Sequence, residues 1–390
     1  MDWHLECSGC GKNYPPDGLR GVCPECGRPF LVRYPLRSHG MKERAEVRRG
    51  SGMWRYRTFL PLEADEEPIT LGEGDTPLLE VPRLASALNL GDAWVKDEAA
   101  NPTGSFKSRG LSAAVTRAVR AGAERFTLPT AGNAGVAAAA YGARAGVPVR
   151  VYAPRTTPTT ILSQIEAFGG DLVLLDGHIG DCGKASREHA AQTGAVDLST
   201  LREPYRIEGK KTLALEIAMQ SNWVLPQAIV YPTGGGTGLI GMWKGFQELE
   251  AAGWVTGPLP RMYSVQAEGC APIVRAWEAG EATAEPWANP ATAASGLRVP
   301  GPLGDALILS AVRLSGGSAV AVTEETLLDL AAFATREEGI DFSPEGGAAI
   351  AGALARRQLG AIGPDDRVIV FNTGAGWLYR NPTELLETER

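Results

Sequence analysis

The 390-residue sequence lacks a long hydrophobic run, a secretion signal and a large excess of either charge. No stretch approaches the roughly 18 uninterrupted apolar residues that span a bilayer, so a membrane partner is not expected. The N-terminus has no basic start followed by an apolar run, which favours a cytoplasmic location. A net charge of −7 gives no electrostatic reason to expect nucleic acid as a partner. The remaining default for a globular composition with 44% hydrophobic residues is an enzyme acting on a small molecule.

Histidine and cysteine are scarce as well. The four histidines give no nucleophile–base pair in the sequence. The six cysteines are not typical of a disulfide framework, because four lie in two tight pairs and Cys182 and Cys270 are isolated. This distribution favours reduced thiols and a bound metal.

The two cysteine pairs, Cys7/Cys10 and Cys23/Cys26, predict a structural zinc site. Each pair lies in a CxxCG turn, and 12 residues separate the two turns. The glycine after each second cysteine allows the positive φ that turns backbone N–H groups toward sulfur. Four thiolates fill a tetrahedral zinc site, so the site should be closed. Four reduced thiols without metal are the alternative, and a redox role is disfavoured because neither pair opens a helix after a strand.

The chain divides into a small module and a large body. Residues 1–35 are rich in Gly, Pro and Cys and form the predicted zinc-ribbon-like module. Residues 37–57 carry a run of basic side chains that indicates a solvated connector. In the body, residues 36–390, short apolar runs alternate with helical patterns. This order is typical of an α/β fold with parallel sheets covered by helices.

Each expected strand of the body ends at a polar or glycine-rich loop. Ligands of open α/β sheets bind beyond the carboxyl ends of the strands, so chemistry is expected at loops 101–107, 130–135, 232–238 and 372–376. The proline-containing segment 280–304 indicates a surface excursion or a mobile cover over the site. The expected strands are Ala93–Lys96, Arg125–Leu128, Val149–Tyr152, Leu172–Leu175, Gln227–Tyr231, Tyr263–Gln266, Ala319–Val322 and Arg367–Phe371.

Lys107 is the candidate nucleophile. It lies in Asn101–Gly110, where Pro and Gly fix a turn between a strand and a helix and Ser105 is the expected N-cap. Lys107 then lies in the first helical turn, where the helix dipole opposes a positive charge. The dipole lowers the pKa of the lysine and favours the neutral amine that Schiff-base chemistry requires. A plain surface lysine is the alternative when this loop is considered alone.

Two glycine loops strengthen the case for a ligand site. Pro232-Thr-Gly-Gly-Gly-Thr-Gly238 follows a strand and opens a helix, so several backbone N–H groups can bind one phosphate. It is not a GxGxxG motif and lacks the Walker lysine. The loop Thr130-Ala-Gly-Asn133-Ala-Gly135 has a similar form with a side-chain amide in it. That amide suits a carboxylate or the oxygen of an aromatic ring.

Taken in order, these blocks resemble the fold-type II family of pyridoxal-phosphate enzymes, and within it the threonine synthases. The resemblance rests on Leu71-Gly-Glu-Gly-Asp-Thr-Pro-Leu78, Asn101–Gly110, Glu208-Gly-Lys-Lys-Thr212 and Pro232–Gly238, and it extends from about residue 70 to 376. It implies a tryptophan synthase beta-like body of two open α/β domains, with a smaller mobile domain at about residues 125–200. Some members carry an N-terminal zinc ribbon, and the family commonly forms homodimers.

The resemblance also assigns roles to individual residues. Lys107 would bind pyridoxal phosphate covalently and move protons, and Asn133 would contact the ring hydroxyl. Thr373, in the turn after the last strand, would meet the pyridine nitrogen. A neutral hydroxyl there makes a weaker electron sink than a carboxylate would, which favours elimination chemistry. The cofactor phosphate would be bound by Gly234, Gly235, Gly236, Thr237 and Gly238.

Threonine synthases convert O-phosphohomoserine and water to threonine and phosphate by γ-elimination and β-addition. Arg206 lies where that family places an arginine for the substrate phosphate. The carboxylate of the substrate would lie near Ser105, Thr130 and Asn133. These assignments make the chain a candidate pyridoxal-phosphate-dependent lyase.

Two departures from the family pattern lie where the substrate is selected. Thr200-Leu201 replaces a common Asn-Ser pair, with Arg202 as a substitute cation, and Gly376-Trp-Leu replaces Gly-Leu-Lys. They leave two alternatives open. One is another fold-type II reaction, either β-replacement on phosphoserine, as in cysteate or cysteine synthase, or serine/threonine dehydration. The other is a ligand-binding protein without catalysis.

Overall fold

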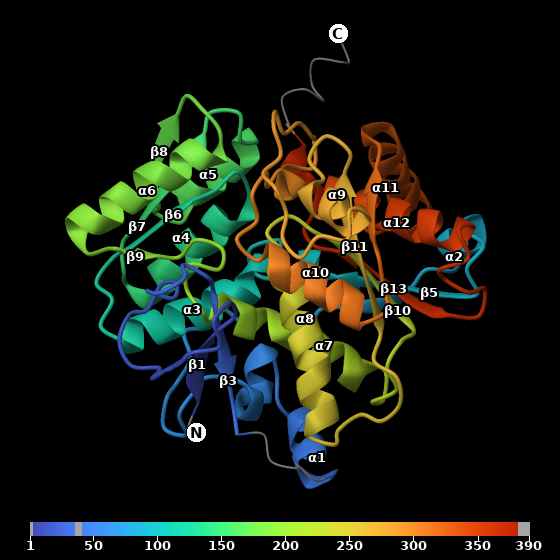
Figure 1. Ribbon diagram of the computed structural model, residues 1–390, viewed down its shortest axis with the longest axis horizontal. Coiled ribbons are helices and arrows are strands. Elements are labelled where there is room, and N and C mark those ends of the chain that lie inside the picture. The colour runs from blue at the N-terminus through green and yellow to red at the C-terminus, as the bar shows by residue number, and fades with distance from the viewer. Residues whose placement is uncertain (1–2, 36–40, 381–390) are drawn as a thin grey trace.

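Three β-sheets organise residues 3–35 and 41–380, the part of the chain described by the computed structural model (Figure 1). The first is a small antiparallel sheet within the predicted ribbon module. Its strand order is β2-β1-β3, and Cys7 at the end of β1 pairs with Phe30 at the start of β3. The strands are β1 (His4–Cys7), β2 (Asn13–Tyr14) and β3 (Phe30–Arg33).

The second sheet has six strands and is parallel apart from its edge strand β4. The order is β12-β11-β10-β13-β5-β4, and the central register places Val370 beside Val95. The strands are β4 (Leu78–Glu80), β5 (Asp92–Asp97), β10 (Ala228–Pro232), β11 (Arg261–Ala267), β12 (Ala319–Val322) and β13 (Arg367–Asn372).

Helices cover both faces of this six-stranded sheet, and its central strands β10 and β13 are accordingly largely apolar. In β10, Ile229 packs in the cluster that includes α7, α8 and α10. Its neighbour Val230 packs on the opposite face with α2, α11 and α12. The helices are α2 (Pro82–Ala87), α7 (Arg206–Gln220), α8 (Thr237–Ala251), α9 (Pro272–Glu278), α10 (Asp305–Leu314), α11 (Glu324–Glu338) and α12 (Pro344–Gln358).

The third sheet is fully parallel, with the order β8-β7-β6-β9, and lies on the left of Figure 1. It extends from Phe126 to Asp197, and its core also receives Leu111 and Val115 from α3. The strands are β6 (Phe126–Pro129), β7 (Val149–Pro154), β8 (Asp171–Leu175) and β9 (Val196–Asp197). The helices are α3 (Lys107–Arg120), α4 (Asn133–Ala145), α5 (Thr159–Ala167) and α6 (Ile179–Thr193).

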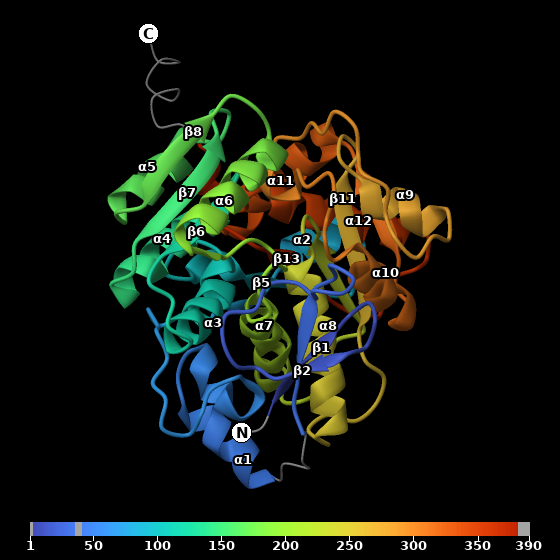
Figure 2. The ribbon, with the colours of Figure 1, turned by 60° about the vertical axis from the view of Figure 1, so that its left-hand side comes forward.

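The ribbon module packs against the helices of the larger sheet, and in Figure 2 its strand β1 lies in front of α7 and α8. Tyr34 Oη donates a hydrogen bond to Glu208 on α7 at 2.7 Å. Arg28, next to the second cysteine turn, forms a 2.9 Å salt bridge with Asp305 at the start of α10. The module is therefore joined to two helices of the body.

The structure confirms all eight strands that the apolar runs predicted, and it corrects two local expectations. Ser105 is not the N-cap of α3, because the helix begins at Lys107 after Phe106 and has no side-chain cap. The expected solvated connector is folded where the structure describes it, with α1 (Met41–Arg49) and the 3-10 turn η1 (Met53–Phe59). Apolar residues between its basic ones, such as Met53 and Phe59, are fully buried.

Short 3-10 turns complete the described chain: η2 (Glu98–Ala100), η3 (Ser295–Leu297) and η4 (Gly376–Tyr379). Among the described residues, no helix combines the length and the apolar character needed to cross a membrane. The cores of the two body sheets lie on either side of the loops that follow β5, β6, β10 and β13. Those loops position the candidate site.

Candidate active site

The Lys107 loop is joined to the loop that follows β13. Phe106 N donates to Thr373 O at 3.0 Å, and Ala375 N donates to Gly104 O at 2.8 Å. Gly104 has a φ of +66°, which a residue with a side chain adopts only with strain. These backbone hydrogen bonds fix the position of Lys107 relative to Thr373. Two candidate residues that are far apart in the sequence therefore belong to one site.

The glycine loop between β10 and α8 forms a narrow cradle that side chains cannot enter. A Cβ on Gly234 would lie 2.1 Å from Gly296 O, and one on Gly238 would lie 2.0 Å from Tyr231 Oη. Gly236 has a φ of +78° and directly precedes the first turn of α8, which begins at Thr237. Free backbone N–H groups at this helix start can bind an anion.

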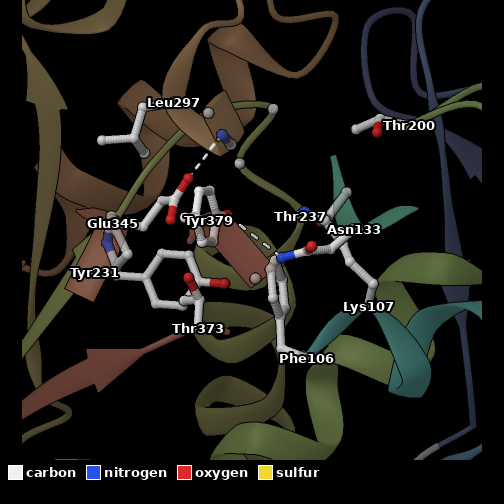
Figure 3. Close-up of a pocket in the computed structure, with 16 residues that line it drawn as sticks. Phe106, Lys107, Asn133, Thr200, Tyr231, Thr237, Leu297, Glu345, Thr373 and Tyr379 are labelled. Atoms are coloured by element: carbon white, nitrogen blue, oxygen red, sulfur yellow. Dashed lines mark hydrogen bonds between the residues drawn. The ribbon is translucent and has the colours of Figure 1, made fainter. Parts of the chain in front are cut away.

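These loops enclose a small cavity of about 50 Å³ that adjoins a larger one of about 560 Å³. Lys107, Asn133 and Gly235 line both of them. Figure 3 shows the smaller cavity, with Lys107 on one side and Glu345 on the other. Asn133, the first residue of α4, reaches the cavity from the side of the four-stranded sheet and donates a 3.4 Å hydrogen bond to Tyr379 Oη. The cavity therefore lies between the four-stranded and the six-stranded sheets.

Burial lowers the pKa of Lys107 to about 7, and the positive charge of Arg206 lowers it further while Glu345 opposes the shift. The predicted direction is confirmed, but burial is the main cause instead of the helix dipole. A lysine with this pKa is largely an uncharged nucleophile slightly above neutral pH.

Three cavity residues were missed by reasoning from the sequence: Tyr231, Glu345 and Tyr379. Glu345 is buried, its Oε1 accepts a 2.7 Å hydrogen bond from Gly296 N, and burial raises its pKa. It follows the Ser343-Pro344 pair that starts α12, so in the sequence it is typical of an ordinary helix start. Tyr231 lies near the end of a largely apolar strand. In the sequence, only its position just before the glycine loop indicates a ligand site.

The predicted substrate residues are distributed unevenly. Thr130 and Asn133 line the larger cavity, whereas Ser105 is fully buried and lines neither cavity. Ser105 instead pairs with Gly374 and accepts from Lys107 N at 3.4 Å. Arg206 also lies behind the cavity walls, where its Nη1 donates to Leu198 O at 2.7 Å. Its Nε and Nη2 have no hydrogen-bond partner among the described residues.

The four cysteines of the ribbon meet as predicted. Their Sγ atoms all lie within 4.8 Å of one another. Cys7 and Cys26 are 3.3 Å apart, and Cys10 and Cys23 are 3.8 Å apart. The glycines that follow the second cysteines have a φ of +70°, and Gly9 N and Cys10 N donate to Cys7 Sγ at 3.4 Å. This cluster has the donor set and geometry of a tetrahedral thiolate site.

Residues 69–374 match the model of the pyridoxal-phosphate dependent enzyme family, and the chain belongs to that family. It is 35% identical to the threonine synthase of Methanosarcina acetivorans, over 99% of this chain and 94% of the relative. It is 34% identical to that of Methanocaldococcus jannaschii, over 95% and 91% of the two chains. Maize serine racemase has the same fold, with a TM-score of 0.69 at 20% identity over 80% of this chain and 91% of that one. The body is therefore a fold-type II pyridoxal-phosphate enzyme.

The site fits pyridoxal phosphate on its own geometry. The four glycines of residues 234–238 leave a cradle that larger side chains would fill, and it opens beside Lys107, whose pKa burial lowers to about 7. Tyr231 Oη, Asn133 Oδ1 and one oxygen of Glu345 are buried without a hydrogen-bond partner among the described residues. Unsatisfied buried polar atoms around one cavity are typical of a site that binds a polar ligand.

Proposed function

We propose that this chain converts O-phosphohomoserine and water to threonine and phosphate. The observation that carries the proposal is the lysine of lowered pKa facing a glycine cradle, in a chain whose relatives across nearly its whole length are threonine synthases. Bound pyridoxal phosphate supplies an electron sink for negative charge that develops on the substrate carbons. The protein must then orient the substrate, move its protons and accommodate the leaving phosphate.

Each of these tasks has a residue in the site. Lys107 Nζ is the base that takes the α proton of the substrate and returns protons to it. Residues 234–238, at the start of α8, would hold the cofactor phosphate, and Thr373 would offer a neutral hydroxyl to the ring nitrogen. Asn133 would contact the ring through its amide. A neutral partner at the ring nitrogen favours elimination of a good leaving group such as phosphate.

The larger cavity supports a phosphorylated substrate. Three arginines, Arg187, Arg202 and Arg298, are among its lining residues. None of the three forms a salt bridge with another described residue. Unpaired arginines around a cavity suit a dianionic group, because the guanidinium fork binds phosphate oxygens in pairs. Arg202 also stands beside Thr200, where the sequence departs from the family pattern, and supplies charge there.

The decisive experiment is phosphate release from cofactor-loaded protein given O-phosphohomoserine, with the amino-acid product identified by chromatography. Threonine formed in equal amount to phosphate supports the proposal. Parallel reactions with O-phosphoserine, serine and threonine test the alternatives of β-replacement and dehydration. Turnover of one of these substrates, with none of O-phosphohomoserine, would overturn the proposal while leaving the cofactor assignment intact.

We also propose that the four ribbon cysteines bind one structural Zn²⁺. The thiolate geometry supports this, and the small core of the module gives it little other stabilisation. Metal analysis of protein purified without added zinc should give one equivalent per chain. A variant in which Cys10 and Cys26 are both replaced by Ser should retain less than half of that metal. An unchanged zinc content in this variant would contradict the assignment.

Assembly and location are further proposals. We propose a cytoplasmic homodimer, in line with the resemblance and with the thiol-rich ribbon. Light scattering on the purified chain should give twice the mass of 41.2 kDa. A monomer mass at the concentrations used in the activity assay would contradict the dimer proposal.

A further inference from the structure

The proline-containing segment 280–304 forms one wall of the larger cavity, and we call it the cover segment. Trp287, Arg298 and Pro300 are among the lining residues that it supplies. Within these residues, all of which the structure describes, the short turn η3 is the only regular element. The shape of this wall therefore depends on contacts that other parts of the chain make with the segment.

Asp305, the first residue of α10, holds the beginning of the cover segment. Its Oδ2 accepts a hydrogen bond from Ala284 N at 2.9 Å. Its Oδ1 accepts one from Arg28 Nη1 at 2.9 Å and one from Ala306 N at 2.8 Å. One carboxylate therefore joins Arg28 of the ribbon module to the cover segment.

The guanidinium of Arg28 stabilises this carboxylate in its place. The Asp305 side chain is only 8% exposed, and Arg28 is its salt-bridge partner within the described residues. A nearly buried carboxylate without a counter-charge is costly, which favours its movement toward water. Loss of the guanidinium thus weakens the hold of Asp305 on Ala284 N.

A second anchor of the cover segment lies within the body. Arg275 Nη2, on α9, donates a hydrogen bond to Glu285 O at 2.7 Å. Its guanidinium also lies 4.9 Å from the centroid of the Trp287 ring. Trp287 N in turn donates to Pro300 O at 2.9 Å, across the segment. The segment is therefore held from the ribbon at Ala284 and from α9 directly after it.

The ribbon module also contacts the segment that carries Arg202, another lining residue of the cavity. A Cβ on Gly21 of the ribbon would lie 3.3 Å from Arg202 O, so the two backbones are close together. Tyr205 Oη donates a hydrogen bond to Pro16 O of the ribbon at 3.3 Å. The module is thus joined to two separate walls of the same cavity.

These two walls meet where Leu201 packs on Gly304. A Cβ on Gly304 would lie 2.4 Å from Leu201 Cδ1, so the glycine makes room for Leu201. Leu201 is buried and has a φ of +64°, which a residue with a side chain adopts only with strain. Such a conformation persists where surrounding contacts hold it. Leu201 lies between Thr200 and Arg202, so the contacts of the ribbon bear on the shape of the cavity.

The substrate of the proposed function would be bound by groups on both walls. Arg298 lies on the cover segment and Arg202 on the other wall. Recognition of one phosphate by two guanidinium groups depends on the distance between them. Lys107 lies on a different loop, so displacement of the cover segment at Ala284 should alter substrate binding more than proton transfer.

We propose that Arg28 is a positioning residue that holds the cover segment through Asp305, so that the ribbon module sets the affinity of the cavity for its substrate. The inference rests on the proposed function for the identity of that substrate. Its first test uses no substrate, so its result is independent of whether threonine is formed.

The first test is amide hydrogen exchange, followed by mass spectrometry in peptides that contain Ala284 and Trp287. R28M keeps much of the side-chain stem without the charge, and R28K keeps a charge. Exchange in these peptides should be at least about fivefold faster in R28M, because Ala284 N loses a firmly held charged acceptor. R28K should restore part of the protection.

R33M is the matched control for R28M. Arg33 pairs with Glu6 inside the ribbon at 2.7 Å, and its side chain is 40% exposed against 36% for Arg28. This pair does not reach the body, so R33M should leave exchange in the cover segment unchanged. Equal exchange rates in R28M and R33M would overturn the proposal.

D305N tests the same link from the body and leaves the sequence of the ribbon intact. It should also accelerate exchange at Ala284, and the double variant R28M/D305N should add little to the larger single effect, because both changes break one link. Additive effects would show that the two residues act separately and would reject the link. All variants are compared at the metal content of the wild type.

The second test separates positioning from a general loss of structure. In R28M the KM for O-phosphohomoserine should rise by at least about fivefold with kcat within about twofold of the wild type, because binding is altered and proton transfer is not. R33M should keep both constants. A lower kcat at unchanged KM would reject the positioning role. Faster exchange in a protein that does not turn over O-phosphohomoserine would support the hold on the cover segment and reject the proposed substrate.

Discussion

Two groups of buried and partly buried charges meet at helices α3 and α7, and they differ in how completely they are paired. The paired cluster consists of Lys96, Glu98, Arg109 and Glu216, all 0% exposed. Arg109 bonds to Glu98 at 2.7 Å and to Glu216 at 3.0 Å, and Lys96 bonds to Glu216 at 2.6 Å. These ion pairs hold the pKa of Glu216 well below its ordinary value and raise that of Arg109.

The underpaired cluster begins only two residues before Arg109, at Lys107, and includes Arg206, Lys210 and Glu345. Arg206 and Lys210 each donate to one backbone carbonyl, and Glu345 accepts from one backbone N–H. Here burial lowers the pKa of both lysines and raises that of Glu345. The comparison teaches that completeness of pairing distinguishes the charges whose ion pairs stabilise the fold from the charges around Lys107, next to the cavity.

Replacement of Lys107 by Ala should have the largest effect and should separate the two clusters by function. Loss of the proton-transferring amine should lower phosphate release by at least roughly 10²–10⁴-fold, with the cooperative unfolding transition retained. Lys184→Ala, at an exposed lysine, is the matched control and should leave the rate unchanged. Repeated turnover by the Lys107 variant would refute the catalytic assignment.

Glu216→Gln breaks the paired cluster and should lower the free energy of unfolding. It leaves Arg109 and Lys96 without a shared carboxylate in the interior, which costs about 3–5 kcal/mol of unfolding free energy. Asp171→Asn removes the partner of Arg150 from an exposed ion pair and should have a much smaller effect. Urea unfolding of the two variants measures the difference, and equal losses would mean that the interior network is not stabilising.

The pH dependence of stability should show the opposite sign for the underpaired cluster. In the folded cofactor-free chain the pKa of Lys107 is about 7, against 10.5 for an ordinary lysine. The unfolded chain binds more protons between these values, so the destabilisation is complete below pH 7 and disappears as the pH rises toward 10.5.

Lys107→Met removes this penalty and should raise the melting temperature of cofactor-free protein by about 2–4 °C near pH 7. The gain should shrink as the pH approaches 10. Burial lowers the pKa of Lys96 as well, but Lys96→Met also removes an ion pair with Glu216, and the loss of that pair should lower the melting temperature. Calorimetry across this pH range checks both signs. A Lys107 variant that melts below the wild type at neutral pH would contradict the comparison.

The smallest expected effect is at Tyr34 of the ribbon. Its hydroxyl donates to Glu208, which belongs to another buried group of ion pairs on α7 and α8. Tyr34→Phe removes one hydrogen bond to a carboxylate that keeps Lys211 and Lys244 as partners. A loss of about 1 kcal/mol is expected. Unfolding measured at constant zinc content tests this value. A loss as large as that of Glu216→Gln would show that this hydrogen bond is the main support of the ribbon interface.

Much of the framework could be predicted because the physical signal was local. Continuous apolar runs such as Ala228–Tyr231 mark strands buried on both faces, and glycine loops after them mark anion cradles. The cysteine turns carry their own geometry. For these elements a few neighbouring residues suffice to indicate the structure.

Helix α7 shows why the remainder could not be predicted. Its sequence contains Arg206, Glu208, Lys210, Lys211 and Glu216, which suggests a solvated face, yet every residue from 206 to 218 is buried. Glu216 and Lys211 find charged partners on β5, α3 and α8 that are distant in the sequence. Burial of such a helix depends on tertiary contacts, which residue spacing does not encode. Glu345 was missed because it lies in an ordinary helix start, and only the fold places it at the cavity.

The contacts of the ribbon also bear on the order in which the chain assembles. Its docking residues Tyr34 and Arg28 bond to partners 174 and 277 positions later in the sequence. During synthesis the module emerges first, and these partners do not exist until most of the chain has been translated. Closing such long loops is slow. For that interval the module depends on its own cysteine cluster. With the proposed zinc site, the availability of metal to the nascent chain should affect the yield of folded protein.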